Sequence, residues 1–334
     1  MNKEIKSLYR VYRPKQFSDV IGQDHVTKTL TNQLLSGGVA HAYLFCGTRG
    51  TGKTSVAKIF ASAVNCLNFK DSSKICGKCE NCKKSGIDVF ELDAASNNRV
   101  EDVREIIDKV KYPPIFGKYK VYIVDEVHMF SASAFNAFLK TLEEPPSHVI
   151  FILCTTEAHK LLPTVQSRCL RFDFRTVSTQ NIEKLLTGIF KKESIESEPE
   201  AVKLISEAGR GCVRDALSFA ETVSAYCGNK KITTTDVSEV LGAVDTKILK
   251  ELLSAILAKQ TEKIVSTVEK IFSVGRNASS VVRSFLDEIK TQFIATKDTR
   301  LMQIYKTFAE LELNIKTAIE ATNMFEGACL VSAF

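Results

Sequence analysis

The feature that most constrains the fold of this sequence is the segment 47–54, which reads G-T-R-G-T-G-K-T. It directly follows a short apolar run, residues 42–46, and directly precedes a stretch with helical periodicity. This order predicts a strand, a tight glycine-rich turn and the first turn of a helix. Such a turn directs successive N–H groups inward, and the helix N-terminus adds a positive dipole end. The segment therefore predicts a phosphate-binding loop, and the flanking elements argue against a chance glycine-rich loop.

The loop matches the pattern G-x-x-x-x-G-K-[ST] in full. We expect the Lys53 ammonium to reach the β- and γ-phosphates of ATP, and the Thr54 hydroxyl to ligate Mg²⁺. The predicted nucleotide-binding residues are Gly47, Thr48, Arg49, Gly50, Thr51, Gly52, Lys53 and Thr54.

Two adjacent carboxylates, Asp125 and Glu126, follow the apolar run 121–124. Open α/β sheets bind ligands at the carboxyl ends of their strands. We expect Asp125 to hold Mg²⁺, directly or through water, and Glu126 to polarise the water that attacks the γ-phosphate. An acidic pair alone could simply cap a helix, but downstream of a full phosphate loop it favours hydrolysis over nucleotide binding alone. A small-molecule kinase needs no such water activator.

Further apolar runs at 88–92 and 149–153 are rich in β-branched and aromatic residues. Continuous runs of this kind are typical of strands buried on both faces of a parallel sheet. Between strands, residues 100–110 carry apolar side chains at helical spacing, and the prolines at 113 and 114 stop that helix. Residues 1–178 therefore predict a doubly wound α/β domain.

Beyond residue 178 the strand runs disappear. Short helices are expected at 179–192, 198–207, 213–226 and 234–241, which together suggest a small helical lid domain spanning 179–243. From 244 to 334 the periodic segments lengthen, with Gly275 as the main interruption, and predict a third, all-helical domain.

The 334 residues are 44% hydrophobic and 25% charged, which indicates a globular chain and excludes a disordered or fibrous one. No apolar run is long enough to span a membrane, and residues 1–6 contain no signal core, so we expect a cytoplasmic protein without a membrane partner. The net charge of +6 permits nucleic acid as a partner. Because the charge is not clustered, it does not argue for one.

Four of the ten cysteines fall in a polar, lysine-rich segment, 66–82, with the spacing C-x9-C-x2-C-x2-C. Overlapping C-x-x-C steps let thiolates converge on one ion, and Zn²⁺ is the ion that four thiolates favour. The predicted structural metal ligands are Cys66, Cys76, Cys79 and Cys82. An iron–sulfur cluster and four free thiols are the alternatives.

The other six cysteines lie mostly in apolar runs and are expected to be buried and inert: Cys46, Cys154, Cys169, Cys212, Cys227 and Cys329.

Several segments together resemble the gamma/tau subunit family of the bacterial DNA polymerase III clamp loader. The members of this family are AAA+ ATPases. They are Y-R-P at 12–14, F-S-D-V-I-G-Q at 17–23, the phosphate loop, the four cysteines, V-D-E-V-H-M at 124–129, F-L-K-T-L-E-E-P-P at 138–146, S-R-C at 167–169 and R-D-A-L at 214–217. The resemblance is dense over residues 8–220 and thinner afterwards. The cysteine module favours this family over archaeal and eukaryotic relatives, and the intact phosphate loop argues against the delta-prime subunit.

The resemblance implies roles for three more residues. Thr156 matches the polar residue called sensor 1, which orients the attacking water beside Glu126, and Thr155 is the adjacent candidate. Arg168 matches the arginine finger that enters the neighbouring subunit's site, where it offsets charge developing on the γ-phosphate. Arg214, in the lid, matches sensor 2, which couples the nucleotide state to the lid angle. A solvated surface arginine is the plain alternative for both.

Similarity also suggests an adenine pocket walled by residues 12–14 and 20–21, although an apolar N-terminal arm could simply pack on the domain. Arg99, Lys140 and Thr164 lie at positions where the family follows the DNA backbone, and solvated side chains are the alternative there.

The resemblance implies an ATPase motor subunit that loads a sliding clamp onto primed DNA, with delta, delta-prime and further copies of itself as partners and the last domain as an oligomerisation collar. No polymerase active site is recognisable in the sequence. The alternative is a scaffold subunit that binds ATP without significant turnover. Longer family members carry further C-terminal domains, whereas this sequence ends in an apolar run at 328–334, so a natural short form and a truncation both remain open.

Overall fold

The computed structural model describes residues 7–84, 86–242, 246–273, 276–315, 318 and 320–334. It divides into two compact units, one comprising residues up to Ser194 with Val202–Glu221, and the other Ile195–Ala201 with Thr222–Phe334. The division into three domains at 178/179 and 243/244 therefore stays a prediction.

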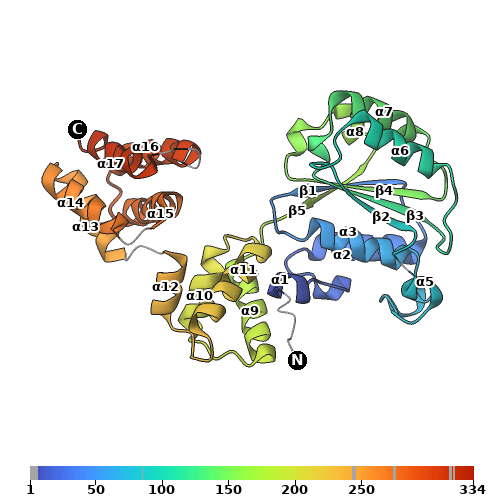
Figure 1. Cartoon of the computed structure of the whole chain (residues 1–334), viewed down its shortest axis with the longest axis horizontal. Helices are drawn as coiled ribbons and strands as arrows, with labels where there is room; N and C mark the ends of the chain where they lie inside the picture. The colour runs from blue at the N-terminus through green and yellow to red at the C-terminus, as the bar shows by residue number, and fades with distance from the viewer. Residues whose placement is uncertain (1–6, 85, 243–245, 274–275, 316–317, 319) are drawn as a thin grey trace. The chain divides into compact units, whose positions relative to one another are not determined.

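The first unit is built on a five-stranded sheet in the order β2-β3-β4-β1-β5 (Figure 1). Its strands are β1 (Ala42–Gly47), β2 (Val89–Asp93), β3 (Lys120–Asp125), β4 (Val149–Thr155) and β5 (Leu170–Phe174). All four neighbouring pairs are parallel. The carboxyl ends of β1, β3 and β4 consequently share one edge of the sheet.

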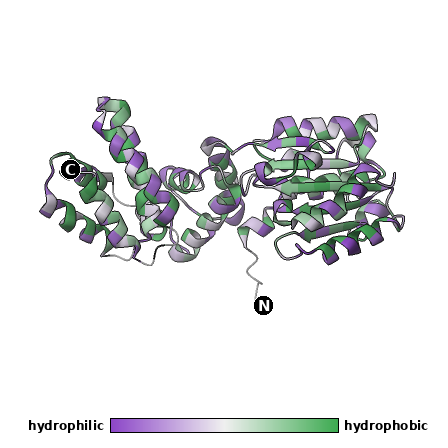
Figure 2. Ribbon diagram, turned by 90° about the horizontal axis from the view of Figure 1, so that it is seen from above, coloured by the Kyte–Doolittle hydropathy of each residue, from purple (hydrophilic) through white to green (hydrophobic). Residues whose placement is uncertain are grey.

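Helices cover both faces of this sheet, α2 (Asp24–Ser36) and α3 (Lys53–Val64) on one side, α6 (Val100–Val110), α7 (Ala132–Glu143) and α8 (Pro163–Gln166) on the other (Figure 1). Alternate side chains of each central strand enter opposite cores, as with Tyr43 and Phe45 against Leu44 and Cys46. Because both faces are covered, the central strands are apolar between their end residues (Figure 2). The predicted α/β class is confirmed.

Two strand expectations need correction. The segment at 88–92 was expected to be buried on both faces, but β2 lies at the sheet edge, and Phe90, Glu91 and Asp93 are exposed. The strand β5 was not predicted, because its sequence L-R-F-D-F alternates and lacks a continuous apolar run. It is the opposite edge strand and buries only Phe172 and Phe174.

The first unit also contains short helices, two before β1 and the others between strands. They are α1 (Leu8–Val11), η1 (Phe17–Asp19), α4 (Phe69–Ser72), α5 (Glu80–Lys83), η2 (Val127–Met129) and η3 (Ala158–Lys160).

The helices expected after the sheet are confirmed as α9 (Thr179–Glu193), α10 (Pro199–Ala208), α11 (Val213–Cys227) and α12 (Thr234–Leu241). The remaining helices are α13 (Thr246–Leu257), α14 (Thr261–Phe272), α15 (Ala278–Thr296), α16 (Arg300–Asn314) and α17 (Ala321–Val331). Their core centres on edge-to-face contacts among Phe285, Phe308 and Phe325. The expected interruption at Gly275 lies outside the described residues. Among the helices that the structure describes, none is long and apolar enough to cross a membrane.

The prediction that the six other cysteines are buried holds for Cys46, Cys154 and Cys329 and is wrong for the rest. Cys169, Cys212 and Cys227 are half-buried, because they lie next to loops at element ends rather than within the sheet or a helix interior.

Candidate nucleotide and metal sites

The phosphate loop joins β1 to α3 at the carboxyl edge of the sheet. Gly50 and Gly52 have φ of +74° and +104°, a left-handed conformation that favours glycine. A Cβ at Gly50 would also overlap the sulfur of Cys212. The Val213 N–H donates to the Gly50 carbonyl at 3.2 Å, so the start of α11 lies directly against the loop.

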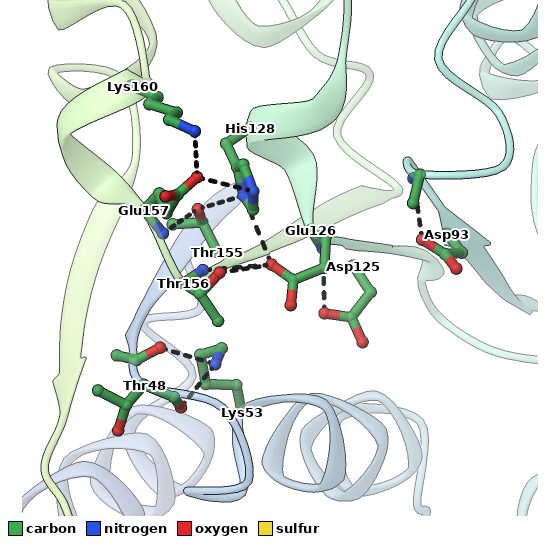
Figure 3. A network of polar contacts seen from close by, with 12 residues as sticks. Thr48, Lys53, Asp93, Asp125, Glu126, His128, Thr155, Thr156, Glu157 and Lys160 are labelled. Atoms are coloured by element: carbon green, nitrogen blue, oxygen red, sulfur yellow. Dashed lines mark hydrogen bonds and ion pairs between the residues drawn. The ribbon is translucent and has the colours of Figure 1, made fainter. Parts of the chain in front are cut away.

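Lys53 is 6% exposed, and its ammonium donates to the carbonyls of Gly47 and Thr48 at 2.8 and 3.0 Å. Burial lowers the pKa of Lys53, while the nearby Glu126 and Asp125 favour the charged form. The ammonium is thus partly desolvated and held within the loop (Figure 3), where an anionic phosphate is a better partner than two neutral carbonyls.

Thr54 and Asp125 meet across the loop. The Thr54 hydroxyl, in the first turn of α3, donates to Asp125 at the end of β3 at 2.7 Å. A hydroxyl and a carboxylate at this separation are oxygen ligands that suit Mg²⁺. The two residues predicted to share the ion are therefore adjacent.

Glu126 adopts a left-handed backbone conformation, with φ of +47°. Its carboxylate accepts hydrogen bonds from the hydroxyl and N–H of Thr156, at 3.0 and 3.3 Å (Figure 3). The hydroxyl of Thr155 instead contacts Nδ1 of His128 at 3.0 Å. Of the two threonines considered from the sequence, Thr156 is the one that contacts the candidate base.

His128 and Glu157 are site residues that the sequence reasoning missed. Nδ1 of His128 lies 3.4 Å from the Glu126 carboxylate, and Nε2 lies 3.3 Å from that of Glu157 (Figure 3). Glu157 also pairs with Lys160 at 2.6 Å. The sequence contains a signal for one of them, because His128 lies three residues after Asp125. The sequence analysis assigned roles only to the two acidic residues of that segment.

A cavity of about 640 Å³ opens beside the loop. One wall comes from the N-terminal arm, here defined as residues 12–21, through Tyr12, Arg13, Pro14, Asp19, Val20 and Ile21. The residues expected to wall the adenine pocket thus line the same cavity as Lys53 and Glu126.

Arg214 also lines this cavity, and its guanidinium lies 5.0 Å from the ring centroid of Tyr9. Arg168 does not line the cavity that the described residues form. It follows α8, pairs with Glu143 at 2.6 Å and donates to the Thr164 carbonyl at 2.8 Å. The structure therefore brings Arg214 to the chain's own phosphate loop and keeps Arg168 away from it.

The three candidate DNA-contact residues are all exposed. Arg99 precedes α6, Lys140 lies on α7 and Thr164 lies on α8. The helices α6, α7 and α8 cover the same face of the sheet (Figure 1).

The four predicted metal ligands converge. The Sγ atoms of Cys66, Cys76, Cys79 and Cys82 all lie within 4.8 Å of one another. The N–H groups of Lys78 and Cys79 donate to the Cys76 sulfur at 3.5 and 3.3 Å, and such bonds lower the pKa of this thiol to about 6. Backbone donors that stabilise thiolate fit a four-thiolate zinc site.

Three family models match successive parts of the chain. Residues 22–178 match the model described as "DNA polymerase III, delta subunit", and 181–229 match "DNA polymerase III clamp loader subunit, ATPase lid domain". Residues 232–318 match "DNA polymerase III subunits gamma and tau domain III".

Curated relatives agree. The DNA polymerase III subunit tau of Bacillus subtilis is 42% identical over 92% of this chain and 53% of its own length. The subunit tau of Escherichia coli is 42% identical over 80% of this chain and 42% of its own length. The subunit gamma of Buchnera aphidicola is 41% identical over 82% of this chain and 76% of its own length. The chain thus spans about half the length of the tau relatives it matches.

Among solved structures, the RuvB Holliday junction branch migration motor of Thermotoga maritima has a TM-score of 0.55 at 18% identity, covering 84% of this chain and 91% of that one. Fold and site together define a phosphate-loop protein built on a five-stranded parallel sheet. Within that class, the chain belongs to the DNA polymerase III gamma/tau subunit family.

Proposed function

We propose that this chain is the ATPase motor subunit of a DNA polymerase III clamp loader, which uses ATP binding and hydrolysis to load a sliding clamp onto primed DNA. The observation that carries the proposal is the arrangement at the sheet edge. Lys53, the Thr54–Asp125 pair and the Glu126–Thr156 pair all converge on one phosphate loop.

In the proposed mechanism the loop N–H groups and Lys53 bind the phosphates, and the remaining loop residues, Gly47 to Gly52, shape that cradle. Thr54 and Asp125 would hold Mg²⁺, which would neutralise negative charge on the bound phosphates. Glu126 accepts the proton of the attacking water, and Thr156 fixes the direction of its carboxylate. The arm residues 12–14 and 20–21 enclose the adenine.

Arg168 acts in trans in this proposal, on a nucleotide bound by the neighbouring copy. Its absence from the chain's own cavity and its pairing with Glu143 support this assignment. In assembly the guanidinium exchanges the Glu143 carboxylate for a γ-phosphate, so that turnover depends on a neighbour. Arg214 contacts the nucleotide in cis and reports its state to the lid.

The remaining assignments complete the proposal. The functional domains are a nucleotide-binding domain at 1–178, a lid at 179–243 and a collar at 244–334. The cysteine module at 66–82 holds structural Zn²⁺. Arg99, Lys140 and Thr164 contact the DNA backbone, and the partners are the clamp, delta, delta-prime and further copies of this chain.

The test is the steady-state ATPase rate of the assembled complex, with and without clamp and primed-template DNA. We expect stimulation by the two together, and loss of about 10³-fold or more of the turnover when every copy carries Arg168→Ala. ATP affinity of the isolated chain should not change in this variant. Arg104→Ala is a matched control, because it removes an exposed arginine of α6 that the proposal places in no site.

Two results would contradict the motor proposal. Turnover that stays flat with all components present would favour the scaffold alternative. Turnover that survives Arg168→Ala would remove the trans-acting role of this arginine.

A further inference from the structure

The cysteine module, residues 66–82, contacts the arm that walls the nucleotide cavity. Gln16 makes two hydrogen bonds to the backbone of Ile75, the residue directly before the ligand Cys76. Its amide NH₂ donates to the Ile75 carbonyl at 2.9 Å, and its amide oxygen accepts from the Ile75 N–H at 2.9 Å. A two-point contact of this kind fixes both the position and the direction of the side chain.

Apolar packing reinforces this contact. The ring of Phe17, next to Gln16, meets the ring of Phe69 in the module edge-on, with centroids 6.4 Å apart. Both rings belong to the core that covers the α2/α3 face of the sheet. The module therefore supports the arm with a polar contact and an apolar one.

The same arm segment continues into the cavity wall. Asp19 accepts hydrogen bonds from the N–H groups of Lys15 and Gln16, at 3.2 and 3.0 Å, which closes the turn around η1. Asp19, Val20 and Ile21 then line the cavity. Only two residues separate Gln16 from the first of these wall residues.

On the module side, little regular structure holds Ile75 in place. Its helices α4 and α5 are four residues each, which is too short to be stable alone. Cys76 itself contacts the other cysteines, with its N–H donating to the Cys66 sulfur at 3.4 Å, and accepts a hydrogen bond from the Lys78 N–H. Because binding a metal to such a site contributes directly to folding it, an ion on the four sulfurs would fix the backbone that Gln16 uses.

We infer that Gln16 is a positioning residue that couples the cysteine module to the nucleotide cavity, so that metal in the module tightens nucleotide binding. The arm has other contacts, Arg13 to Ser55 at 3.2 Å and Tyr12 to Glu193 at 2.5 Å, but neither reaches the module. This inference rests on the proposed function for its two ligands, zinc and ATP. Linkage requires the effect to be reciprocal: nucleotide must tighten metal binding by the same factor.

The test measures the dissociation constant of a fluorescent ATP analogue for the full chain, loaded with Zn²⁺ and after removal of Zn²⁺ by a chelator. We expect removal to weaken binding about fivefold or more in the parent. Gln16→Ala should bind the analogue as weakly as the metal-free parent and respond little to the chelator. In the assembled complex this variant should raise the KM for ATP and leave kcat unchanged.

Two further variants separate positioning from loss of fold. Gln16→Glu keeps the acceptor for the Ile75 N–H and removes the donor, so an intermediate effect is expected. Lys15→Ala keeps the backbone bond to Asp19 and removes only an exposed side chain, so it should match the parent.

The reciprocal measurement is zinc affinity by competition with a chromophoric chelator. Saturating nucleotide should raise it in the parent and not in Gln16→Ala. Nucleotide affinity that is unchanged after verified loss of zinc would overturn the coupling, as would equal coupling in Gln16→Ala. A parent that binds no zinc or no nucleotide would instead contradict the proposed function, so the two failures are distinguishable.

Discussion

The Thr54 hydroxyl donates a 2.7 Å hydrogen bond to the carboxylate of Asp125. This bond joins the first turn of α3 to the end of β3, and its two residues are 71 positions apart in the sequence. It places the two predicted Mg²⁺ ligands side by side, next to Lys53 and Glu126. The two residues that we propose as Mg²⁺ ligands therefore meet only when the loop and the sheet edge come together.

Replacing Thr54 with alanine should abolish Mg²⁺-dependent nucleotide binding. The substitution removes one proposed oxygen ligand and the hydroxyl donor to Asp125. Thr54→Ser keeps the hydroxyl and should retain most of the affinity. Titration of a fluorescent ATP analogue with and without Mg²⁺ checks both variants, and unimpaired Mg²⁺-dependent binding by Thr54→Ala would remove the hydroxyl from the ion site.

Replacing His128 with alanine should lower turnover of the assembled complex by up to about 100-fold, the effect of a small displacement of a catalytic group. His128 fills the space between the carboxylates of Glu126 and Glu157, so its loss frees Glu126 on one side. ATP affinity should stay constant, because His128 does not line the cavity that the described residues form. His128→Asn, which retains a polar side chain, should recover part of the rate; equal loss of affinity and rate would point to a structural defect instead.

Replacing Cys79 with serine should reduce bound zinc to a small fraction of the parent value. A tetrahedral site loses one of its four thiolates and does not gain a comparable ligand. Metal analysis of the purified chains gives the stoichiometry. Cys227→Ser is the matched control, because that cysteine lies outside the cluster. Equal zinc in Cys79→Ser and parent would mean that the four cysteines do not form the metal site.

Asp88 should make the stability of the first unit sensitive to acid. It is 4% exposed and accepts hydrogen bonds from the N–H groups of Ile115, Phe116 and Gly117 at 2.6, 2.8 and 2.7 Å. Burial opposes ionisation, but these donors outweigh it and lower the pKa of Asp88.

Because the folded-state pKa is lowered, the Asp88 contribution is present above the unfolded value of about 3.9 and is lost as the pH falls through the folded-state pKa. Asp88→Asn should therefore lower the free energy of unfolding by roughly 1–3 kcal/mol near neutral pH. The amide NH₂ of asparagine is itself a donor and would face the three backbone N–H groups. The difference in free energy of unfolding between this variant and the parent should become smaller below about pH 4. Urea unfolding at several pH values measures this, and a pH-independent difference would contradict it.

Local patterns in the sequence determined the elements that depend on neighbouring residues. The glycine positions and the following helical stretch specify the phosphate loop, because left-handed turns and helix starts are set by adjacent residues. Cysteine spacing likewise predicted a cluster that the structure brings together. The central strands could be predicted from the sequence, because strands buried on both faces consist of continuous apolar runs.

Only the tertiary structure decided what depends on the sheet order and on contacts between distant segments. β5 is an edge strand with an alternating sequence, so nothing local marked it as part of a parallel sheet. The choice of Thr156 over Thr155, the place of His128 between two carboxylates and the contact of Gln16 with Ile75 each require two segments to meet in space. Successive side chains at a strand end point in opposite directions. A sequence pattern does not show which neighbouring residue each of these side chains contacts.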